Sequence, residues 1–103
     1  MAKPTKFSNQ KVEQDLAKLS GWKHDRNALT KEFTLSSFTG AAKFIAKIAP
    51  IANRMDHHPD LRLHRYKRVT ITLTTHDAGG ITQKDFVLAA KIDTLVPPGS
   101  ASA

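Results

Sequence analysis

The chain contains no cysteine among its 103 residues. This absence excludes a disulfide framework, catalysis by a thiol and any metal site built from thiolates. Histidine, carboxylate and hydroxyl groups therefore remain as the side chains that could carry chemistry.

Long apolar runs are also missing. No stretch approaches the roughly 20 apolar residues that a membrane-spanning helix needs. The first seven residues, MAKPTKF, carry charge but are followed by no apolar segment of the kind found in a secretory signal. With 40% apolar and 24% charged residues, the composition is typical of a soluble globular protein, and we expect a cytoplasmic location.

Acidic residues are scarce relative to basic ones. Nine Asp and Glu stand against 16 Lys and Arg, which gives a formal net charge of +7. Such a surplus favours encounters with anionic partners. The cations are spread along the chain, however. One local group comprises Arg62, Arg65, Lys67 and Arg68. This group also fits a solvated strand edge. Because no nucleic-acid-binding motif accompanies the charge, we do not expect a nucleic-acid partner.

The length is that of a single small domain, and no internal repeat is visible. We expect this domain to occupy residues 1–95. The last eight residues, VPPGSASA, hold two prolines and little apolar side chain to bury. They predict a flexible C-terminal tail over residues 96–103.

Two helices are predicted in the first half of the chain. Ser8 can cap a helix that ends near Gly21 and has apolar residues on one face, namely Val12, Leu16 and Leu19. From Phe38 to Ala52, apolar residues recur at three- and four-residue steps, which predicts a second helix packed on a sheet. Pro50 lies inside this pattern, so the helix should either bend there or stop near Ala49 and restart.

Strand signals separate these helices from a third one. Residues 22–35 predict a β-hairpin around Asp25-Arg26-Asn27, and residues 69–74 alternate apolar and threonine side chains as a half-buried strand does. A further strand is expected near 61–65. After Ala78-Gly79-Gly80, Thr82 and Asp85 have the spacing of a capping box that opens a third helix. This order predicts an α+β domain with helices on one face of an antiparallel sheet.

Three histidines fall where side chains of such a domain can meet. His57 and His58 come directly after the second predicted helix, and Pro59 keeps that helix from continuing through them. His76 closes the alternating strand, and Asp85 opens the helix that follows. The topology therefore allows the three imidazoles to converge on one site.

Each of these residues also has a purely structural interpretation. His57 could face the dipole at the end of the second helix, His76 could be an exposed strand-end residue, and Asp85 could be a helix cap. A zinc site is a further alternative, because three histidines can hold the ion with an open fourth position. The adjacent histidine pair is an awkward chelate, however, and two histidines four apart on one helix are missing.

Several short motifs occur together in the chain. They are DHHP at 56–59, YKRVTITLTTH at 66–76 and AGGITQKD at 78–85, with LSGW at 19–22, KEFTLSSF at 31–38 and FIAKIA at 44–49 upstream. In this combination the sequence resembles the pterin-4a-carbinolamine dehydratase family, over nearly its whole length from about Val12 to Asp93.

The resemblance implies a four-stranded antiparallel sheet backed by helices, in a protein that assembles as a homodimer or homotetramer. It also implies an activity, the dehydration of 4a-hydroxytetrahydropterin to quinonoid dihydropterin, which serves the recycling of tetrahydrobiopterin for aromatic amino-acid hydroxylases. Neither a metal nor a redox cofactor is implied. Some animal members of the family bind a homeodomain transcription factor as a dimerisation cofactor, a partner that the resemblance permits without implying it.

The resemblance also assigns roles to particular residues. His57 and His76 would form the acid/base pair, and His58 would mainly hold the pterin. Imidazole suits this chemistry, because eliminating water needs one proton removed and one delivered, and an unperturbed imidazole has a pKa of about 6.5. Asp85 would orient His76 or a substrate amine. Trp22 would pack against the flat pterin ring, although a place in the hydrophobic core fits it equally well.

Two positions depart from the family pattern. An acidic residue is common four positions before the first histidine, where this chain has Asn53. Its amide can hydrogen-bond near the substrate but carries no negative charge. The aromatic residue usual shortly after the proline is also missing, with Leu61 and Leu63 in that region. A non-catalytic protein-binding module therefore stands as the alternative to a dehydratase.

Overall fold

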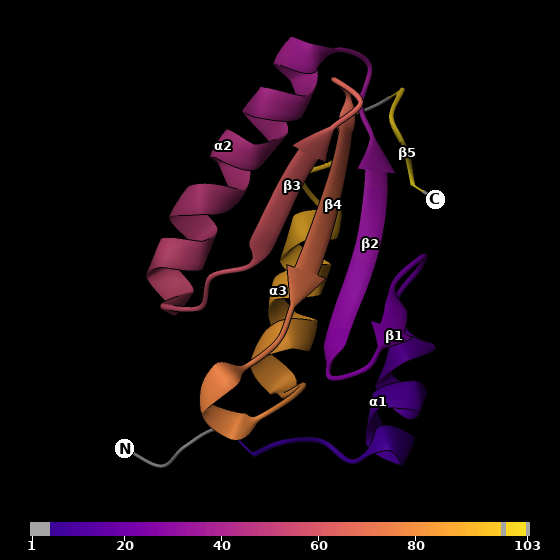
Figure 1. The fold of residues 1–103 in the computed structure, drawn as a ribbon, viewed down its shortest axis with the longest axis vertical. Coiled ribbons are helices and arrows are strands. Elements are labelled where there is room, and N and C mark those ends of the chain that lie inside the picture. The colour runs from indigo at the N-terminus through magenta and orange to yellow at the C-terminus, as the bar shows by residue number, and fades with distance from the viewer. Residues whose placement is uncertain (1–4, 98, 103) are drawn as a thin grey trace.

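A computed structural model describes residues 5–97 and 99–102. In chain order, the elements of these residues are α1 (Asn9–Leu16), β1 (Lys23–Asp25), β2 (Ala28–Thr34), α2 (Phe38–Met55), β3 (Asp60–His64), β4 (Arg68–Leu73), the short 3-10 helix η1 (His76–Ala78), α3 (Gln83–Asp93) and β5 (Ala101–Ser102) (Figure 1).

The strands form one antiparallel sheet with the order β1-β2-β4-β3. The two-residue strand β5 adds to the free part of β2 beyond β1, with Ala101 opposite Thr34 and Ser102 opposite Phe33. The order of elements and the antiparallel sheet confirm the predicted α+β class. Part of the predicted tail thus forms β5, while residues 98 and 103 lie outside the described residues, so a flexible tail stays a prediction.

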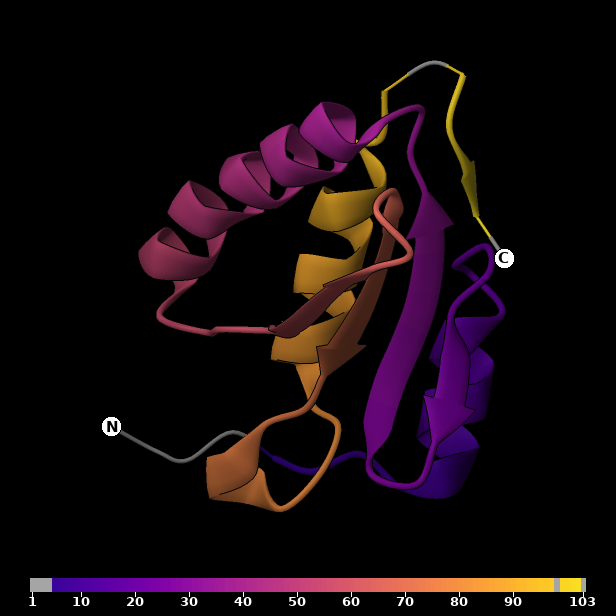
Figure 2. The same cartoon turned by 45° about the horizontal axis from the view of Figure 1, so that its top comes forward.

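Alternation along the central strands decides which face of the sheet is buried. In β4, Val69, Ile71 and Leu73 are fully buried, and the residues between them are half-buried. Figures 1 and 2 show α1, α2 and α3 on the same side of the sheet. The apolar side chains of β2 and β4 meet Phe44 and Leu88, among others, in a single core cluster. The structure therefore confirms the prediction that the helices lie on one face of the sheet.

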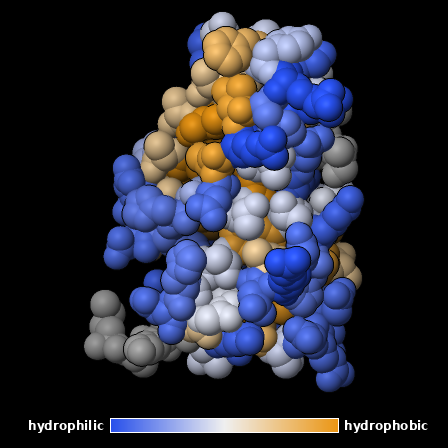
Figure 3. All heavy atoms as spheres, in the orientation of Figure 1, coloured by the Kyte–Doolittle hydropathy of each residue, from blue (hydrophilic) through white to orange (hydrophobic). Residues whose placement is uncertain are grey.

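The opposite face of the sheet is polar. It carries the half-buried residues of the alternating pattern, namely Thr30, Glu32, Thr34, Arg68, Thr70 and Thr72. Figure 3 shows this face as mostly hydrophilic, with a hydrophobic band along the side where α2 and β3 lie. Ile45, Leu61 and Leu63 are partly buried apolar residues of these two elements.

The helix ends largely follow the predicted caps. The Ser8 hydroxyl accepts the Lys11 N–H at 3.1 Å, which confirms Ser8 as the N-cap of α1. The helix ends at Leu16, however, before the predicted Gly21, which instead takes a left-handed conformation in the following turn. The capping box of Thr82 and Asp85 is present at the start of α3.

Of the two outcomes predicted for the second helix at Pro50, a bend or a stop near Ala49, the stop does not occur. Helix α2 runs unbroken over 18 residues with Pro50 inside it. The proline removes one backbone hydrogen bond, but it lies on the exposed side of the helix. Ile48 and Ala52 flank it and are both buried in the core. Burial of the apolar face on both sides of Pro50 offsets the local cost of the proline.

A partly buried ion pair joins β2 to the end of α3. The Lys31 ammonium donates to Asp93 Oδ1 at 2.9 Å and to the Ser20 carbonyl at 2.6 Å, and its side chain is only 6% exposed. The Trp22 indole N–H donates to the same Asp93 carboxylate at 3.0 Å. The cluster therefore joins the chain before β1, the central sheet and α3.

Replacing Lys31 with Met is expected to lower the free energy of unfolding by about 2 kcal/mol, because a partly buried carboxylate and a backbone carbonyl lose their charged donor. Asp93 keeps the indole and some contact with solvent, which limits the loss. Urea unfolding of Lys31→Met measures the change, with Lys23→Met on exposed β1 as the matched control. A loss below about 0.5 kcal/mol, the usual range for surface substitutions, would contradict a structural role for the pair.

Candidate active site

The adjacent histidines His57 and His58 follow α2 and point in different directions. Asp56 follows the helix in a left-handed conformation, with φ of 49°, and its N–H closes on the carbonyls of Ala52 and Asn53. The His57 N–H then donates to the Ala52 carbonyl at 3.1 Å. The backbone is no longer helical at His58, so the two imidazoles reach separate environments. His57 is buried and His58 is exposed.

The turn after β4 brings the third histidine to the same place. Thr75 continues the extended backbone of β4 and forms an isolated bridge with Gly80. Between them, η1 begins at His76, and Gly79 closes the turn with φ of 76°, which glycine adopts without strain. His76 is consequently an exposed side chain at the rim of the sheet.

The three histidines share one pocket of about 230 Å³. Its lining consists of Asp56, His57, His58, Thr74, Thr75, His76, Asp77 and Lys84. The convergence that the topology allows is therefore present in the structure. Imidazoles from two separate turns face a common space in which a small substrate could meet them.

Asp85 is the partner of His57. Its Oδ1 lies 2.6 Å from His57 Nε2, and both side chains are buried, Asp85 completely. Because an ionised carboxylate only accepts hydrogen bonds, Nε2 carries the proton in this pair. Nδ1, the other ring nitrogen, has no hydrogen-bond partner among the described residues. When the imidazole of His57 is neutral, this pairing leaves Nδ1 as its proton-accepting nitrogen.

The second oxygen of Asp85 is held just as firmly. Oδ2 accepts the Thr82 N–H and the Thr75 hydroxyl, each at 2.9 Å. The oxygens of Asp85 are thus bound to His57, Thr75 and Thr82, and no described hydrogen bond joins Asp85 to His76. A contact between Asp85 and a substrate amine stays a prediction. Asp85 caps α3 and holds His57 at the same time, because α3 begins beside the pocket.

His58 is held from α2. Its Nε2 lies 3.1 Å from Asn53 Oδ1, in an exposed hydrogen bond. Asn53 therefore contacts a histidine of the site, although it is not itself part of the pocket lining. The amide leaves this contact uncharged, whereas a carboxylate there would favour the imidazolium of His58. A direct contact between Asn53 and substrate stays a prediction.

Trp22 does not lie with the histidines. It is 5% exposed, its indole donates to Asp93, and its ring meets Phe33 edge-on at 6.1 Å between centroids. It is absent from the lining of the histidine pocket. Of the two interpretations that the sequence left open, these contacts support the place in the core.

Thr75 and Lys84 are members of the site that sequence reasoning missed. Thr75 lines the pocket and binds both Asp85 and the Thr82 hydroxyl, the latter at 2.8 Å. In the sequence, Thr75 directly follows the alternating strand of residues 69–74 and was given no role. Lys84 lines the pocket from the first turn of α3. Its position beside Asp85 was the signal that could have found it.

Among 5–97 and 99–102, no helix is both long and apolar enough to cross a membrane. In the same part of the chain, no group of three or more histidine, aspartate or glutamate side chains is arranged as a set of metal ligands.

The fold and the histidine pocket belong to a known class of protein. Residues 5–95 match the family model for pterin 4 alpha carbinolamine dehydratase, so the chain belongs to this family. Among the curated relatives described as candidate pterin-4-alpha-carbinolamine dehydratases, one from Roseiflexus sp. (strain RS-1) is 45% identical, over 89% of this chain and 98% of the relative. Another, from Sulfolobus acidocaldarius, is 42% identical over 87% of this chain and 98% of its own length.

Solved structures agree with this assignment. A protein described as a transcriptional coactivator/pterin dehydratase from Brucella melitensis superposes with a TM-score of 0.85 at 30% identity, over 90% of this chain and all of the other. A pterin dehydratase-like protein described as a RuBisCO assembly factor in the alpha-carboxysome has a TM-score of 0.58 at 24% identity, over 72% of this chain and 84% of the other. The second likeness shows a shared fold.

Proposed function

We propose that this protein catalyses the dehydration of 4a-hydroxytetrahydropterin to quinonoid dihydropterin and water. The observation that carries the proposal is the pocket that joins His57, His58 and His76, with His57 held by the buried carboxylate of Asp85. Membership of the pterin dehydratase family supports it independently. In a cell, the reaction would serve the recycling of tetrahydrobiopterin.

The geometry suggests a division of labour between the histidines. Nδ1 of His57 takes the proton from N5 of the pterin, and Asp85 stabilises the imidazolium that forms, as a carboxylate does in other acid/base pairs. The C4a–O bond breaks as the N5 electron pair forms the C4a=N5 double bond. His76 delivers a proton to the departing hydroxyl, which leaves as water, and solvent restores the proton because His76 is exposed. His58 positions the ring.

A stopped-flow absorbance assay tests the activity directly. The native protein is expected to speed the decay of 4a-hydroxytetrahydropterin above the buffer rate, in proportion to protein concentration. The assay is run from pH 5.5 to 8.5, which brackets the unperturbed imidazole pKa of about 6.5. Decay at the buffer rate throughout this range would mean that the fold serves another purpose.

Assembly of several copies is part of the proposal. Strand β3 forms an edge of the sheet, with no described strand paired on its outer side. The hydrophobic band of Figure 3 runs beside this edge, and partly buried apolar residues of α2 and β3 lie there. An open edge next to apolar surface suits a homodimer or homotetramer. Sedimentation velocity measures the state, and a monomer at micromolar concentration would contradict this part.

A second candidate is a role in binding another protein, with little catalysis. The similarity to the Brucella melitensis structure supports this candidate, because that protein is described as a transcriptional coactivator as well as a pterin dehydratase. Such a role would fit the loss of the usual acidic residue at Asn53. The two candidates differ in what this position does to turnover.

Asn53→Glu separates these candidates. If the protein is a working dehydratase, the native chain is already active and the variant changes kcat by less than about fivefold, because an exposed ion pair with His58 is worth about 1 kcal/mol or less. Stopped-flow kinetics compare the native chain, Asn53→Glu and the uncharged control Asn53→Gln. A nearly inert native protein that Asn53→Glu alone activates strongly would favour the binding role.

A further inference from the structure

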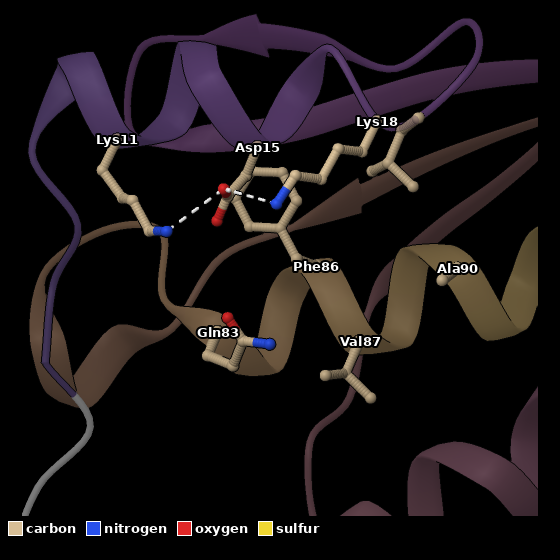
Figure 4. A pocket seen from close by; sticks show the side chains of 8 residues that line it. Lys11, Asp15, Lys18, Gln83, Phe86, Val87 and Ala90 are labelled. Atoms are coloured by element: carbon tan, nitrogen blue, oxygen red, sulfur yellow. Dashed lines mark hydrogen bonds and ion pairs between the residues drawn. The ribbon is translucent and has the colours of Figure 1, made fainter.

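A second hollow of about 330 Å³ lies between α1 and α3 (Figure 4). Figure 4 shows Lys11, Asp15 and Lys18 on the α1 side and Gln83, Phe86, Val87 and Ala90 along α3, with Leu19 completing the lining. We call this hollow the α1–α3 groove. It is larger than the histidine pocket, and the two share no lining residue. Its volume is at the lower end of the range for small-molecule sites.

The floor of the α1–α3 groove is apolar and contains an aromatic ring. Leu19, Val87 and Ala90 contribute aliphatic surface. The Phe86 ring is 8% exposed and stacks on Phe7 at 6.0 Å between centroids. The ring is fixed between its neighbours, and its small exposed part adds to the apolar surface of the floor. A planar apolar group would cover this floor with little loss of side-chain freedom.

The wall of the groove carries more positive than negative charge. Lys11 Nζ and Lys18 Nζ lie 3.2 and 3.7 Å from the same oxygen, Oδ1 of Asp15. Figure 4 shows both amines turned toward this carboxylate. The Asp15 side chain is 12% exposed, whereas those of Lys11 and Lys18 are 47% and 78% exposed. One carboxylate thus gathers two accessible ammonium groups at the groove and leaves a net charge of +1.

Each ammonium has three donors, so contact with Asp15 leaves donors for a second anion. We propose that the α1–α3 groove binds a small aromatic carboxylate, with its ring on the floor beside Phe86 and its carboxylate on Lys11 and Lys18. Charge complementarity selects an anion rather than a cation, and the small volume suits a single fused ring system. The proposal is independent of the dehydratase activity, because none of these residues lines the histidine pocket.

Amide chemical shifts of ¹⁵N-labelled protein, titrated with 2-naphthoate, test the proposal. Saturable shifts are expected at residues 11–19 and 83–90. Uncharged 2-naphthalenemethanol and cationic 2-naphthylmethylammonium are titrated in parallel and should both bind more weakly. The double substitution Lys11→Gln and Lys18→Gln should weaken 2-naphthoate binding between about 2-fold and 30-fold, the range for two exposed ion pairs.

Two further variants make the result specific. Lys43→Gln with Lys47→Gln changes the net charge equally on the exposed side of α2 and should leave the affinity within about twofold. Ala90→Trp at an exposed position of α3 should fill the groove and abolish the shifts. The proposal is overturned by the absence of saturable shifts in the groove, by equal or tighter binding of the uncharged or cationic probe, or by equal weakening in both lysine pairs.

Discussion

His57→Ala is expected to lower kcat for pterin dehydration by roughly 100-fold or more, the usual contribution of a general acid or base. The reason is the position of the imidazole, because His57 lines the pocket. Its Nε2 is bound to Asp85, and its Nδ1 has no partner among the described residues. Alanine in this position cannot take the proton. Stopped-flow decay of 4a-hydroxytetrahydropterin measures the loss.

The alanine variant also leaves the buried Asp85 Oδ1 without a donor, which costs about 1–3 kcal/mol of stability. His57→Gln is the sharper variant, because its amide can still donate to Asp85 while it cannot move a proton. Both variants should lose turnover, but only the alanine variant should lose stability. His64→Gln, outside the pocket, serves as control and should keep full activity. Normal kcat in folded His57→Gln would exclude His57 as the base.

Asp85→Asn is expected to lower kcat by roughly 100-fold or more while the protein stays folded. The site of Oδ2 accepts hydrogen bonds from both Thr75 and Thr82, so the amide oxygen of asparagine belongs there. Its NH₂ group then faces His57 Nε2, which must become an acceptor. The proton moves to Nδ1, and this nitrogen changes from acceptor to donor. Inversion of a catalytic tautomer in this way removes the base.

NMR of ¹⁵N-labelled histidine distinguishes the two tautomers of His57, so the cause can be observed apart from the rate. The spectrum should show an Nε2–H tautomer in the native protein and an Nδ1–H tautomer in Asp85→Asn. Asp25→Asn at the exposed β1 turn makes the same chemical change away from the site and should alter neither spectrum nor kcat. An unchanged His57 tautomer together with unchanged kcat in Asp85→Asn would show that Asp85 is only a helix cap.

Local patterns in the sequence were enough to predict most elements. The alternation of residues 69–74 and the capping box of Thr82 and Asp85 depend on near neighbours, and β4 and α3 lie where these patterns place them. The helical periodicity around Pro50 was also correct, and the helix does not stop at the proline. Its cost is local, whereas the burial that offsets it comes from contacts with the sheet and α3.

The sequence by itself determined the α+β class, the membership of the pterin dehydratase family and the three histidines as candidates, because these follow from periodicity and short motifs. Only the tertiary structure decided which groups pair. His57 and Asp85 are 28 positions apart, and Trp22 and Asp93 are 71 apart. Asp85 therefore holds His57 rather than His76, and Trp22 belongs to the core. Such pairs depend on how α2, α3 and the sheet pack, which no local pattern of side chains encodes.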